Sequence, residues 1–440
     1  ALNSNSISVT LANSGTSIVD VSGTGDDDTI SNIENITGTQ LDDEIRGNDE
    51  NNILEGNAGD DTLEGGAGDD TLDGGTQNIA DTVDYSSATS GVTVDLGIDG
   101  TAQAIGANQG SDTLVDIENV IGSTDDDTFK TNYSKDNNFD GNLGKDTVDY
   151  SSLDVDDVTV DKVVADLSSN SGTITSNSGG TPTTANDSYD SIENITASAG
   201  NDTLTGDDED NKLDGNAGDD IIDGAGGDDY IDGGTHTNGD TVNYSSANEG
   251  ISVDLGIDGT AQFISASAGT DTLNSIENVI GSKYADTFKG NNSVSNTFNG
   301  GITDLSNPNS ENSSDENDKV SYADSTNPIV ANLSAGTVVI GGSVTDNLYN
   351  IEHVQGTDGD DEFTGNADDN SLIGGAGNDT FNIVDVNNGN DVIEGDTSAG
   401  NDGLRDTIDY SAISDSYYLD ADLSTNSLEL KNSSNNALAD

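Results

Sequence analysis

The chain has 440 residues but no cysteine, methionine or tryptophan, and only 3 prolines. Without cysteine, a disulfide framework and thiolate metal sites are excluded. Cations are scarce, with 11 Lys and Arg against 85 Asp and Glu and a formal net charge of -74. Nucleic acid and anionic membranes are excluded as partners, because this charge repels both. No stretch approaches the ~20 apolar residues of a membrane helix, so we expect no direct membrane insertion.

Apolar residues are also few, at 30% of the chain, and aromatic residues make up 4%. Composition alone favours disorder, because such a chain buries too little surface to offset the loss of chain entropy. Two features argue against disorder: proline is scarce, and the 54 glycines recur at fixed spacing together with Leu, Ile and Val. Self-repulsion would still unfold a compact form, so we expect folding to require bound cations.

Glycine and aspartate recur with a period of nine. From Gly38 the chain reads GTQLDDEIR, GNDENNILE, GNAGDDTLE, GGAGDDTLD and GGT. Glycine holds the first place of each nine, Asp or Asn the sixth, and Leu or Ile the eighth. The pattern returns further along, so that three arrays cover residues 38–75, 197–234 and 356–382.

A longer period of 159 residues encloses these arrays, since residues 31–130 align without a gap onto 190–289. Tandem units of this kind stack on their neighbours. We therefore predict one continuous solenoid, with no helix, because no apolar set at helical spacing persists. Its parts are residues 1–30 as the end of a diverged repeat, 31–189 as long repeat 1, 190–348 as long repeat 2 and 349–440 as a partial long repeat 3.

Each nine predicts a turn followed by a minimal strand. In residues 65–73, Gly65, Gly66 and Gly68 allow positive φ and close backbone approach, so the first six residues form the turn. The last three residues form a strand in which Leu72 points inward and its neighbours outward. Two nines make one coil, and strands of successive coils pair in parallel. The predicted fold is all-β, a parallel β-roll (β-solenoid) with looped insertions between coils.

Stacked coils place the sixth-place carboxylates in rows that repel one another unless a cation lies between them. Ca²⁺ takes ~6–8 oxygen ligands from carboxylates and backbone carbonyls, and glycine-rich turns offer both. We predict multiple Ca²⁺ ions in the turns. The predicted metal-binding residues are Asp28, Asp43, Gly56, Gly59, Asp61, Gly65, Gly68, Asp70, Asp81, Asp127, Asp146, Asp202, Gly215, Gly218, Asp220, Gly224, Gly227, Asp229, Asp240, Asp286, Asp361, Gly374, Gly377, Asp379, Asp391 and Asp402.

These nines resemble the RTX (repeats-in-toxin) family, the haemolysin-type calcium-binding nonapeptide G-G-x-G-x-D-x-U-x, most closely at 56–73 and 374–382. The resemblance implies a right-handed parallel β-roll, calcium-triggered folding outside the cell and type I secretion. The D-T-V-x-Y-S and I-E-N-V-x-G-S segments resemble units of large bacterial surface and adhesion proteins, so we expect an extracellular or cell-surface location. One turn of each array departs from the pattern and is expected to bind calcium weakly or not at all. Its sixth place is Asn52, Asn211 or Asn370.

Two recurring side chains have alternative interpretations. We interpret the glutamate of each Ile-Glu unit as part of a solenoid corner. The alternative is that it binds calcium. These residues are Glu34, Glu118, Glu193, Glu277 and Glu352. We expect the tyrosine of each D-T-V-x-Y-S unit to cover an edge of the roll or to stack with its neighbours inside. The alternative is that it binds sugar. These residues are Tyr85, Tyr150, Tyr244, Tyr322 and Tyr410.

No catalytic motif is apparent, and repeated carboxylates suit a scaffold better than a singular active site, so we interpret the chain as a non-enzyme. The leading hypothesis is a secreted bacterial structural protein of a surface layer (S-layer), extracellular filament or adhesin stalk. It would fold on binding Ca²⁺ and self-associate, head-to-tail or laterally. One alternative is a secretion and folding module of a larger exported enzyme or toxin. Another is a repeat face that binds ice or a cell-surface glycan.

Overall fold

The structure is a computed structural model that describes residues 5–22, 27–75, 80–106, 108–153, 161–176, 183–301, 317–384, 390–396 and 405–413, and the backbone of 417–422 and 427–432. Strands dominate these residues, and the helical elements among them are three short 3-10 turns, η1 (Leu96–Ile98), η2 (Leu255–Ile257) and η3 (Leu333–Ala335). None of these turns is long enough to span a membrane. The chain divides into two compact units. Unit 1 comprises residues 1–224 and 229–238, and unit 2 comprises 225–228 and 239–440.

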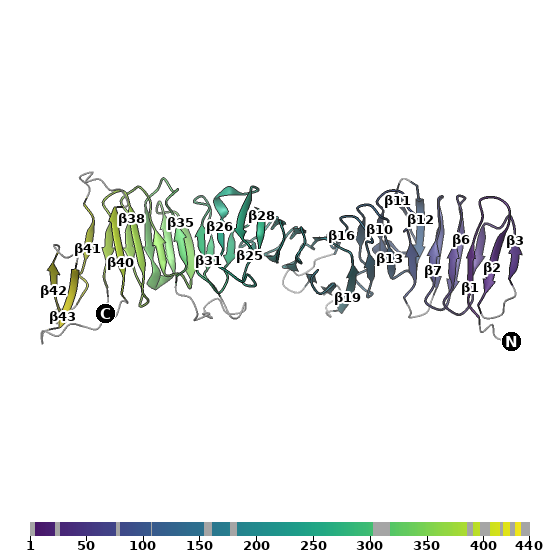
Figure 1. Cartoon of the computed structure of the whole chain (residues 1–440), viewed down its shortest axis with the longest axis horizontal. Coiled ribbons are helices and arrows are strands. Elements are labelled where there is room, and N and C mark those ends of the chain that lie inside the picture. The colour runs from purple at the N-terminus through teal and green to yellow at the C-terminus, as the bar shows by residue number, and fades with distance from the viewer. Residues whose placement is uncertain are drawn as a thin grey trace. The chain divides into compact units, whose positions relative to one another are not determined.

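Unit 1 is a coil of short strands that alternate between two faces, as the stack from β1 to β13 in Figure 1 shows. Parallel pairing dominates, with antiparallel pairs at β1 to β3, β11 to β12 and β17 to β19. In order of pairing, the strands of the first face are β3 (Asp28–Ile30), β2 (Ser17–Val21), β1 (Ile7–Thr10), β5 (Glu44–Arg46), β7 (Thr62–Glu64), β9 (Thr82–Asp84), β13 (Asn119–Ile121), β15 (Asn138–Asp140), β19 (Thr183–Asp190), β18 (Ser171–Ser176), β17 (Lys162–Asp166), β21 (Thr203–Thr205) and β23 (Ile221–Asp223).

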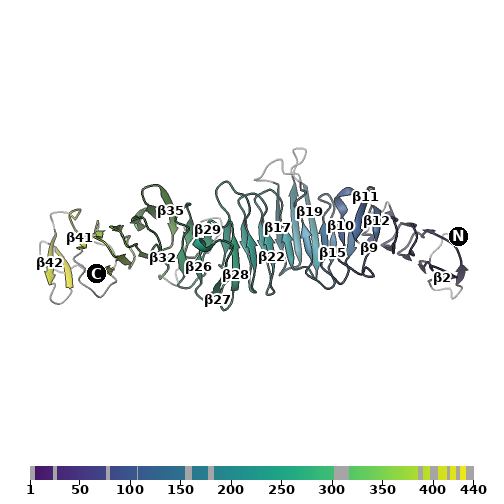
Figure 2. The ribbon, with the colours of Figure 1, turned by 90° about the horizontal axis from the view of Figure 1, so that it is seen from above.

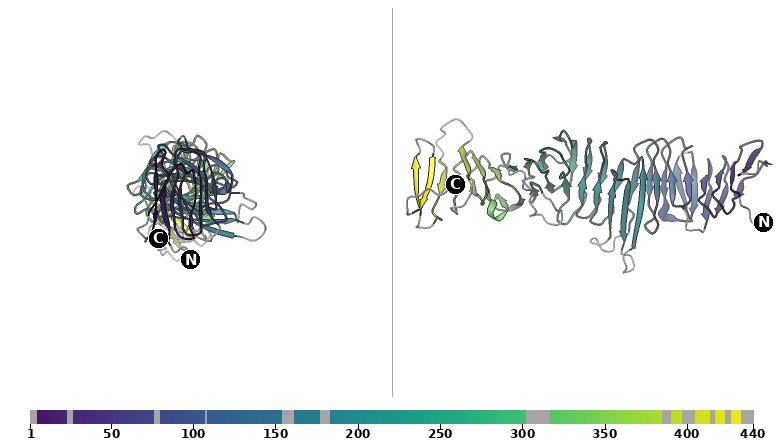
Figure 3. Two further views of the ribbon diagram at one scale, coloured as in Figure 1. Left: turned by 90° about the vertical axis from the view of Figure 1, so that its right-hand side faces the viewer. Right: turned by 60° about the horizontal axis from the view of Figure 1, so that its bottom comes forward.

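The second face of unit 1 consists of two sheets. The first sheet contains β4 (Asn35–Thr37), β6 (Ile53–Asn57), β8 (Thr71–Gly75), β12 (Gly110–Val115) and β11 (Ala102–Gly106). The second contains β10 (Thr93–Asp95), β14 (Thr128–Lys130), β16 (Thr147–Asp149), β20 (Asn194–Thr196), β22 (Lys212–Asp214) and β24 (Tyr230–Asp232). Figure 3 shows the strands of this unit side by side, from purple to teal.

Unit 2 repeats this construction. Its first face contains β25 (Thr241–Asn243), β29 (Asn278–Ile280), β31 (Thr297–Asn299), β35 (Val344–Tyr349), β34 (Thr337–Ile340), β33 (Ile329–Asn332), β37 (Glu362–Thr364), β39 (Thr380–Asn382) and β41 (Thr407–Asp409). Its second face contains β26 (Ser252–Asp254), β30 (Thr287–Lys289), β32 (Lys319–Ser321), β36 (His353–Gln355), β38 (Ser371–Gly375) and β40 (Val392–Asp396). Two antiparallel hairpins join β27 (Ala261–Ser265) to β28 (Gly269–Asn274) and β42 (Tyr417–Asp422) to β43 (Ser427–Asn432).

The predicted parallel β-roll is confirmed by the pairing of the nines. Ile45 lies beside Leu63, eighteen residues or two nines later, and Leu54 lies beside Leu72 in the same way. All four side chains are fully buried. Each buried Leu or Ile contributes about 1.5–3 kcal/mol, so the eighth places supply the thin core that the composition allows.

Three pairs of buried phenylalanine rings also fill this core. The rings stack nearly in parallel, with centroids 5.0 to 5.6 Å apart. The stacked pairs are Phe129 with Phe139, Phe288 with Phe298, and Phe363 with Phe381.

The predicted looped insertions are hairpins inserted into the stack. In unit 1 the chain leaves β10 through η1, turns back along β11, and rejoins the stack when β12 pairs in parallel with β8. Asp95 caps η1 by accepting a hydrogen bond from the N–H of Gly97 at 2.8 Å. A longer antiparallel excursion through β17, β18 and β19 rejoins the stack beside β15, as Figure 2 shows. Each excursion therefore changes the local strand order and leaves the roll continuous on either side.

Candidate metal sites

The sixth-place aspartates point into the roll and connect its coils. Asp43, Asp61 and Asp81 are at most 3% exposed. The N–H of Asp43 donates to Oδ1 of Asp61 at 2.7 Å, and the N–H of Asp61 donates to Oδ1 of Asp81 at 2.8 Å. The N–H of Asp81 donates to Oε2 of Glu118 at 3.1 Å. We call such a series a carboxylate ladder, because each carboxylate binds the backbone of the coil before it.

Ladders of this kind recur in both units, and three of them end on the glutamate of an Ile-Glu unit. This contact supports the corner interpretation of those glutamates. Their steps, from donor to acceptor, include Val92 to Asp127 (2.6 Å), Asp127 to Asp146 (2.7 Å), Asp146 to Glu193 (2.8 Å), Val163 to Asp202 (2.6 Å), Asp202 to Asp220 (2.7 Å), Asp240 to Glu277 (3.0 Å), Ile251 to Asp286 (2.7 Å), Asp286 to Asp318 (2.7 Å), Asp318 to Glu352 (3.0 Å), Ile329 to Asp361 (2.7 Å), Asp361 to Asp379 (2.9 Å) and Asp379 to Asp406 (3.0 Å).

A second kind of row begins at an asparagine. The Nδ2 group of Asn52 donates to the carbonyl oxygen of Glu34 at 2.7 Å, and its N–H donates to Oδ1 of Asp70 at 2.7 Å. Asn211 repeats the contact on the carbonyl oxygen of Glu193 at 3.0 Å. A carboxylate has no proton to donate to a carbonyl oxygen. Asn replaces Asp in these turns because its amide group supplies the hydrogen-bond donor that the carbonyl oxygen requires.

The buried tyrosines donate to aspartates that sequence reasoning missed. Tyr85 is fully buried, and its hydroxyl donates to Oδ2 of Asp112 at 2.9 Å. A signal was present, because such an Asp stands five residues before an Ile-Glu pair in four units. The rings of these tyrosines are buried, which supports a structural role for them rather than sugar binding. The other pairs are Tyr150 with Asp187 (3.1 Å), Tyr244 with Asp271 (2.7 Å) and Tyr322 with Asp346 (2.9 Å).

Burial makes the charged form of these carboxyl groups unfavourable. Desolvation raises the pKa of Asp61 and Asp70 to about 6, against the lowering effect of the backbone N–H that each accepts. The pKa of Asp81 and Asp146 rises to about 7, again mainly by desolvation, with nearby carboxylates adding to the shift. Near neutral pH and without a cation, the folded protein therefore buries several carboxylate groups. Their surroundings do not stabilise the negative charge.

Several of these carboxylates retain one oxygen with no hydrogen-bond partner. The Oδ2 atoms of Asp61, Asp70, Asp146 and Asp379 are buried and accept no hydrogen bond. An unsatisfied buried carboxylate oxygen is costly, and a bound cation is the usual remedy. These orphaned oxygens fit a metal ion, so the structure supports the predicted role of the turns.

The glycines of the turns bring further oxygens close. A Cβ atom built on Gly65 would lie 2.2 Å from Oδ2 of Asp70, and one on Gly38 would lie 2.7 Å from the carbonyl oxygen of Gly56. A Cβ atom on Gly59, at φ +132°, would lie 2.4 Å from the backbone of Leu41. Only glycine permits this approach, and the resulting donors are all oxygens, the set that Ca²⁺ prefers. The carboxylates and turn carbonyls would hold the ion, which would supply the missing positive charge.

A glycine of positive φ holds the fourth place in the predicted calcium turns of Asp61, Asp70, Asp220, Asp229 and Asp379. The values are +132° for Gly59, +128° for Gly68, +131° for Gly218, +117° for Gly227 and +125° for Gly377. The first-place glycines lie against the side chain of their own sixth residue. The built Cβ atom would lie 2.1 to 2.5 Å from that side chain at Gly56, Gly65, Gly215, Gly224 and Gly374.

The other predicted ligands lie in different settings. Asp28 is exposed on β3, which pairs antiparallel with β2, so it does not share the buried setting of the ladder aspartates. Asp391 is partly buried, and its Oδ1 accepts the N–H of Asn370 at 3.0 Å. Asp229 is 2% exposed, and its Oδ1 accepts the N–H of Asn211 at 2.9 Å. Asp402 lies outside the described residues.

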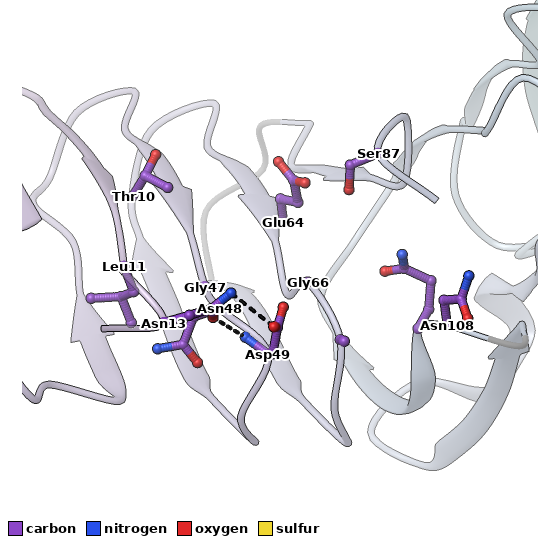
Figure 4. Close-up of a pocket in the computed structure, with 12 residues that line it drawn as sticks. Thr10, Leu11, Asn13, Gly47, Asn48, Asp49, Glu64, Gly66, Ser87 and Asn108 are labelled. Atoms are coloured by element: carbon purple, nitrogen blue, oxygen red, sulfur yellow. Dashed lines mark hydrogen bonds between the residues drawn. The ribbon is translucent and has the colours of Figure 1, made fainter. Parts of the chain in front are cut away.

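A hollow of about 370 Å³ lies on unit 1, and Figure 4 shows its lining. Its carboxylates are engaged by neighbouring residues. Asn13 and Asp49 exchange two hydrogen bonds of 2.8 Å, and Glu64 pairs with Arg46 at 2.5 Å. The orphaned carboxylate oxygens belong to the turns and not to this hollow.

Comparison with known families supports the same turns. Residues 37–78, 189–222, 205–235 and 350–381 match the family model of the RTX calcium-binding nonapeptide repeat, in four copies. No curated protein matches the chain. Repeats of this family bind calcium, form β-rolls and are typical of exported proteins. The matched segments overlap all three arrays that the nine-residue period delimits. The arrays of this chain are RTX calcium-binding nonapeptide repeats.

Proposed function

We propose that this chain is a secreted structural protein of the bacterial exterior, a component of a surface layer, filament or adhesin stalk, that folds when its turns bind Ca²⁺. The orphaned oxygens of the buried turn aspartates, such as Oδ2 of Asp61, are the observation that carries this proposal. Each is held between backbone segments of neighbouring coils, so an ion bound there ties coil to coil.

Bound calcium would also reduce the electrostatic repulsion within the whole chain. A formal net charge of -74 opposes any compact form, and Arg46 and Lys135 are among only 11 cations available to oppose it. A ligand that binds the folded state alone stabilises it by about 2.7 kcal/mol for each site when present at 100 times its Kd. Several such sites supply the stability that a core of short strands cannot.

The repeats favour a structural rather than a catalytic role. The buried carboxylates recur with the period of the fold, and those of Asp61, Asp81 and Glu118 are used in contacts between coils. The same parallel pairing that joins coils within a chain can join two chains at exposed strand edges. A second copy of this chain, added head-to-tail, is therefore the proposed partner.

Circular dichroism of the full chain, first in chelator and then with millimolar Ca²⁺, tests the calcium part. We expect coil to convert to β-structure with Ca²⁺ and much less with Mg²⁺, which requires a tighter octahedral shell. An equal response to both ions would contradict the proposal. Sedimentation velocity and electron microscopy of the calcium-loaded chain test assembly, and strictly monodisperse monomers at high concentration would count against it.

A further inference from the structure

The turns of the roll, inside and outside the arrays, fall into two classes that differ at the second residue. In one class the N–H of the second residue donates to the side chain of the sixth, and we call these closed turns. In the other the second residue has positive φ, which turns its N–H away from the sixth side chain, and we call these open turns. The second residues of the closed turns are Thr39, Asn48, Ser123, Ser198, Asp207, Ser282, Thr357 and Asn366. Those of the open turns include Asn57, Gly66, Asn142, Asn216 and Gly375.

Closed turns with Ser or Thr satisfy both oxygens of their aspartate. In the turn of Asp361, the N–H of Thr357 donates to Oδ2 at 2.6 Å and the hydroxyl donates at 3.1 Å. The same hydroxyl accepts the N–H of Gly359 at 2.9 Å. Ser123 makes the corresponding contacts to Asp127 at 2.7 and 2.9 Å. The hydroxyl therefore ties the fourth residue of the turn to the carboxylate with no ion between them.

Open turns leave the second oxygen of the aspartate unsatisfied. Gly66 has φ +93° and Asn142 has φ +63°, and in their turns Oδ2 of Asp70 and Oδ2 of Asp146 are orphaned. The fourth place follows the same division. Gly68 has φ +128° in an open turn, whereas Gly359 in a closed turn lies outside the left-handed region. The backbone thus takes a different path in each class.

The chain itself substitutes Asn for Asp only in closed turns, among the described turns of the arrays. The Oδ1 atoms of Asn52, Asn211 and Asn370 accept the N–H of their second residues at 2.7, 2.8 and 2.9 Å. An amide oxygen is sufficient for that contact. In the open turns named above the sixth residue is always Asp.

We propose that only the open turns bind calcium, and that the second residue of each nine decides the class. Asp43, Asp127, Asp202, Asp286 and Asp361 then hold their coils by hydrogen bonds alone. The ions concentrate on Asp61, Asp70, Asp146 and Asp379, whose Oδ2 atoms are unsatisfied. This inference rests on the proposed calcium-dependent folding and specifies which carboxylates serve it.

Two adjacent steps of one ladder provide a matched pair of variants. Asp43 and Asp61 are both buried and both accept a backbone N–H from another coil, but Asp43 is closed by Thr39 and Asp61 is open. The experiment measures calcium bound per full-length chain, by equilibrium dialysis and by titration calorimetry, for wild type, Asp43→Asn and Asp61→Asn. We expect Asp61→Asn to bind fewer ions than wild type and Asp43→Asn to bind as many. Equal losses in both variants would overturn the division into classes.

A gain-of-binding variant keeps the test decisive if Asp61→Asn folds poorly. Thr357→Gly changes GTDGDDEFT to GGDGDDEFT and removes the hydroxyl and the preference against positive φ. We expect this variant to bind more calcium than wild type, with circular dichroism confirming that it folds. If the variant binds no more calcium than wild type, the second residue does not decide whether a turn binds calcium. A wild type that binds no calcium would instead refute the proposed function, so the two failures are distinguishable.

Discussion

The N–H of Asp61 donates a hydrogen bond of 2.8 Å to Oδ1 of Asp81, one coil further along the roll. The buried carboxylate of Asp81 accepts a hydrogen bond from a backbone N–H that does not take part in the pairing of the strands. The donor residue, Asp61, is itself a candidate calcium ligand through its unsatisfied Oδ2, so the contact couples the stacking of coils to the occupation of the turns.

Without calcium, the protein should be more stable in acid than at neutral pH. The folded-state pKa of Asp61 and Asp70 is about 6 and that of Asp81 and Asp146 about 7, above the ordinary value of 3.8. A carboxyl group with a raised folded pKa binds its proton more tightly when folded. Its stabilisation is complete below pH ~4 and is lost as the pH rises through 6 to 7.

Circular dichroism in chelator between pH 4 and 7.5 measures this dependence, as the content of β-structure at each pH and, where the chain is folded, its melting temperature. With saturating calcium the trend should reverse, because the ion competes with the proton for the same oxygens. A chelated protein whose stability rises with pH over this window would contradict the raised pKa values.

The thin core makes single eighth-place residues important. Leu54 is fully buried, whereas Ile53, the preceding residue of β6, is 45% exposed. We expect Leu54→Ala to lower the free energy of unfolding by about 2–5 kcal/mol, as large-to-small core substitutions do. Ile53→Ala should change it by less than about 1 kcal/mol. Denaturant unfolding in saturating calcium compares the two, and equal effects would mean that the inward and outward faces are misassigned.

The hydroxyl of Tyr85 satisfies Oδ2 of Asp112, which lies fully buried. Tyr85→Phe keeps the ring and removes the donor, so we expect a loss of about 1–3 kcal/mol in calcium-loaded protein. Tyr284→Phe, at a partly exposed ring, is the control and should be nearly neutral. The same unfolding assay applies, and a neutral Tyr85→Phe would show that Asp112 is neutralised by another route.

Fourth-place glycines should differ in their tolerance of alanine. Gly59 has φ +132°, and an added Cβ would lie 2.4 Å from the backbone of Leu41, so Gly59→Ala should cost at least about 1–3 kcal/mol. Gly359 also holds a fourth place but lies outside the left-handed region, with its nearest neighbour at 3.3 Å. Gly359→Ala should therefore be mild. Melting temperatures in calcium separate the two, and a similar loss in both would contradict the different turn paths.

The fold was predictable because its signals are local and repeated. A single nine such as residues 65–73 already contains the glycines that turn the chain and the Leu72 that faces inward. The pairing of Leu54 with Leu72 follows from two nines making one coil. Stacking then needs no long-range information, since each coil meets only its neighbours.

The finer chemistry of the turns was less accessible to the sequence. Asp43 and Asp61 both hold a sixth place, and only the contact from Thr39 distinguishes them. The role of Asp112 depends on a tyrosine 27 residues earlier, which the hairpin of β11 and β12 brings back to it. Such pairings depend on how an insertion returns to the stack, and the nine-residue period carries no information about that.

The carboxylate ladders have a direction. In each cross-coil step the donor N–H belongs to the earlier coil and the carboxylate to the later one, as from Asp43 to Asp61 and from Asp127 to Asp146. The two sides of any stack of coils are therefore chemically different. The coil on the C-terminal side of a junction contributes the acceptor, and the coil on the N-terminal side contributes the donor. A further coil that joins the stack must match this polarity, which favours head-to-tail over head-to-head addition.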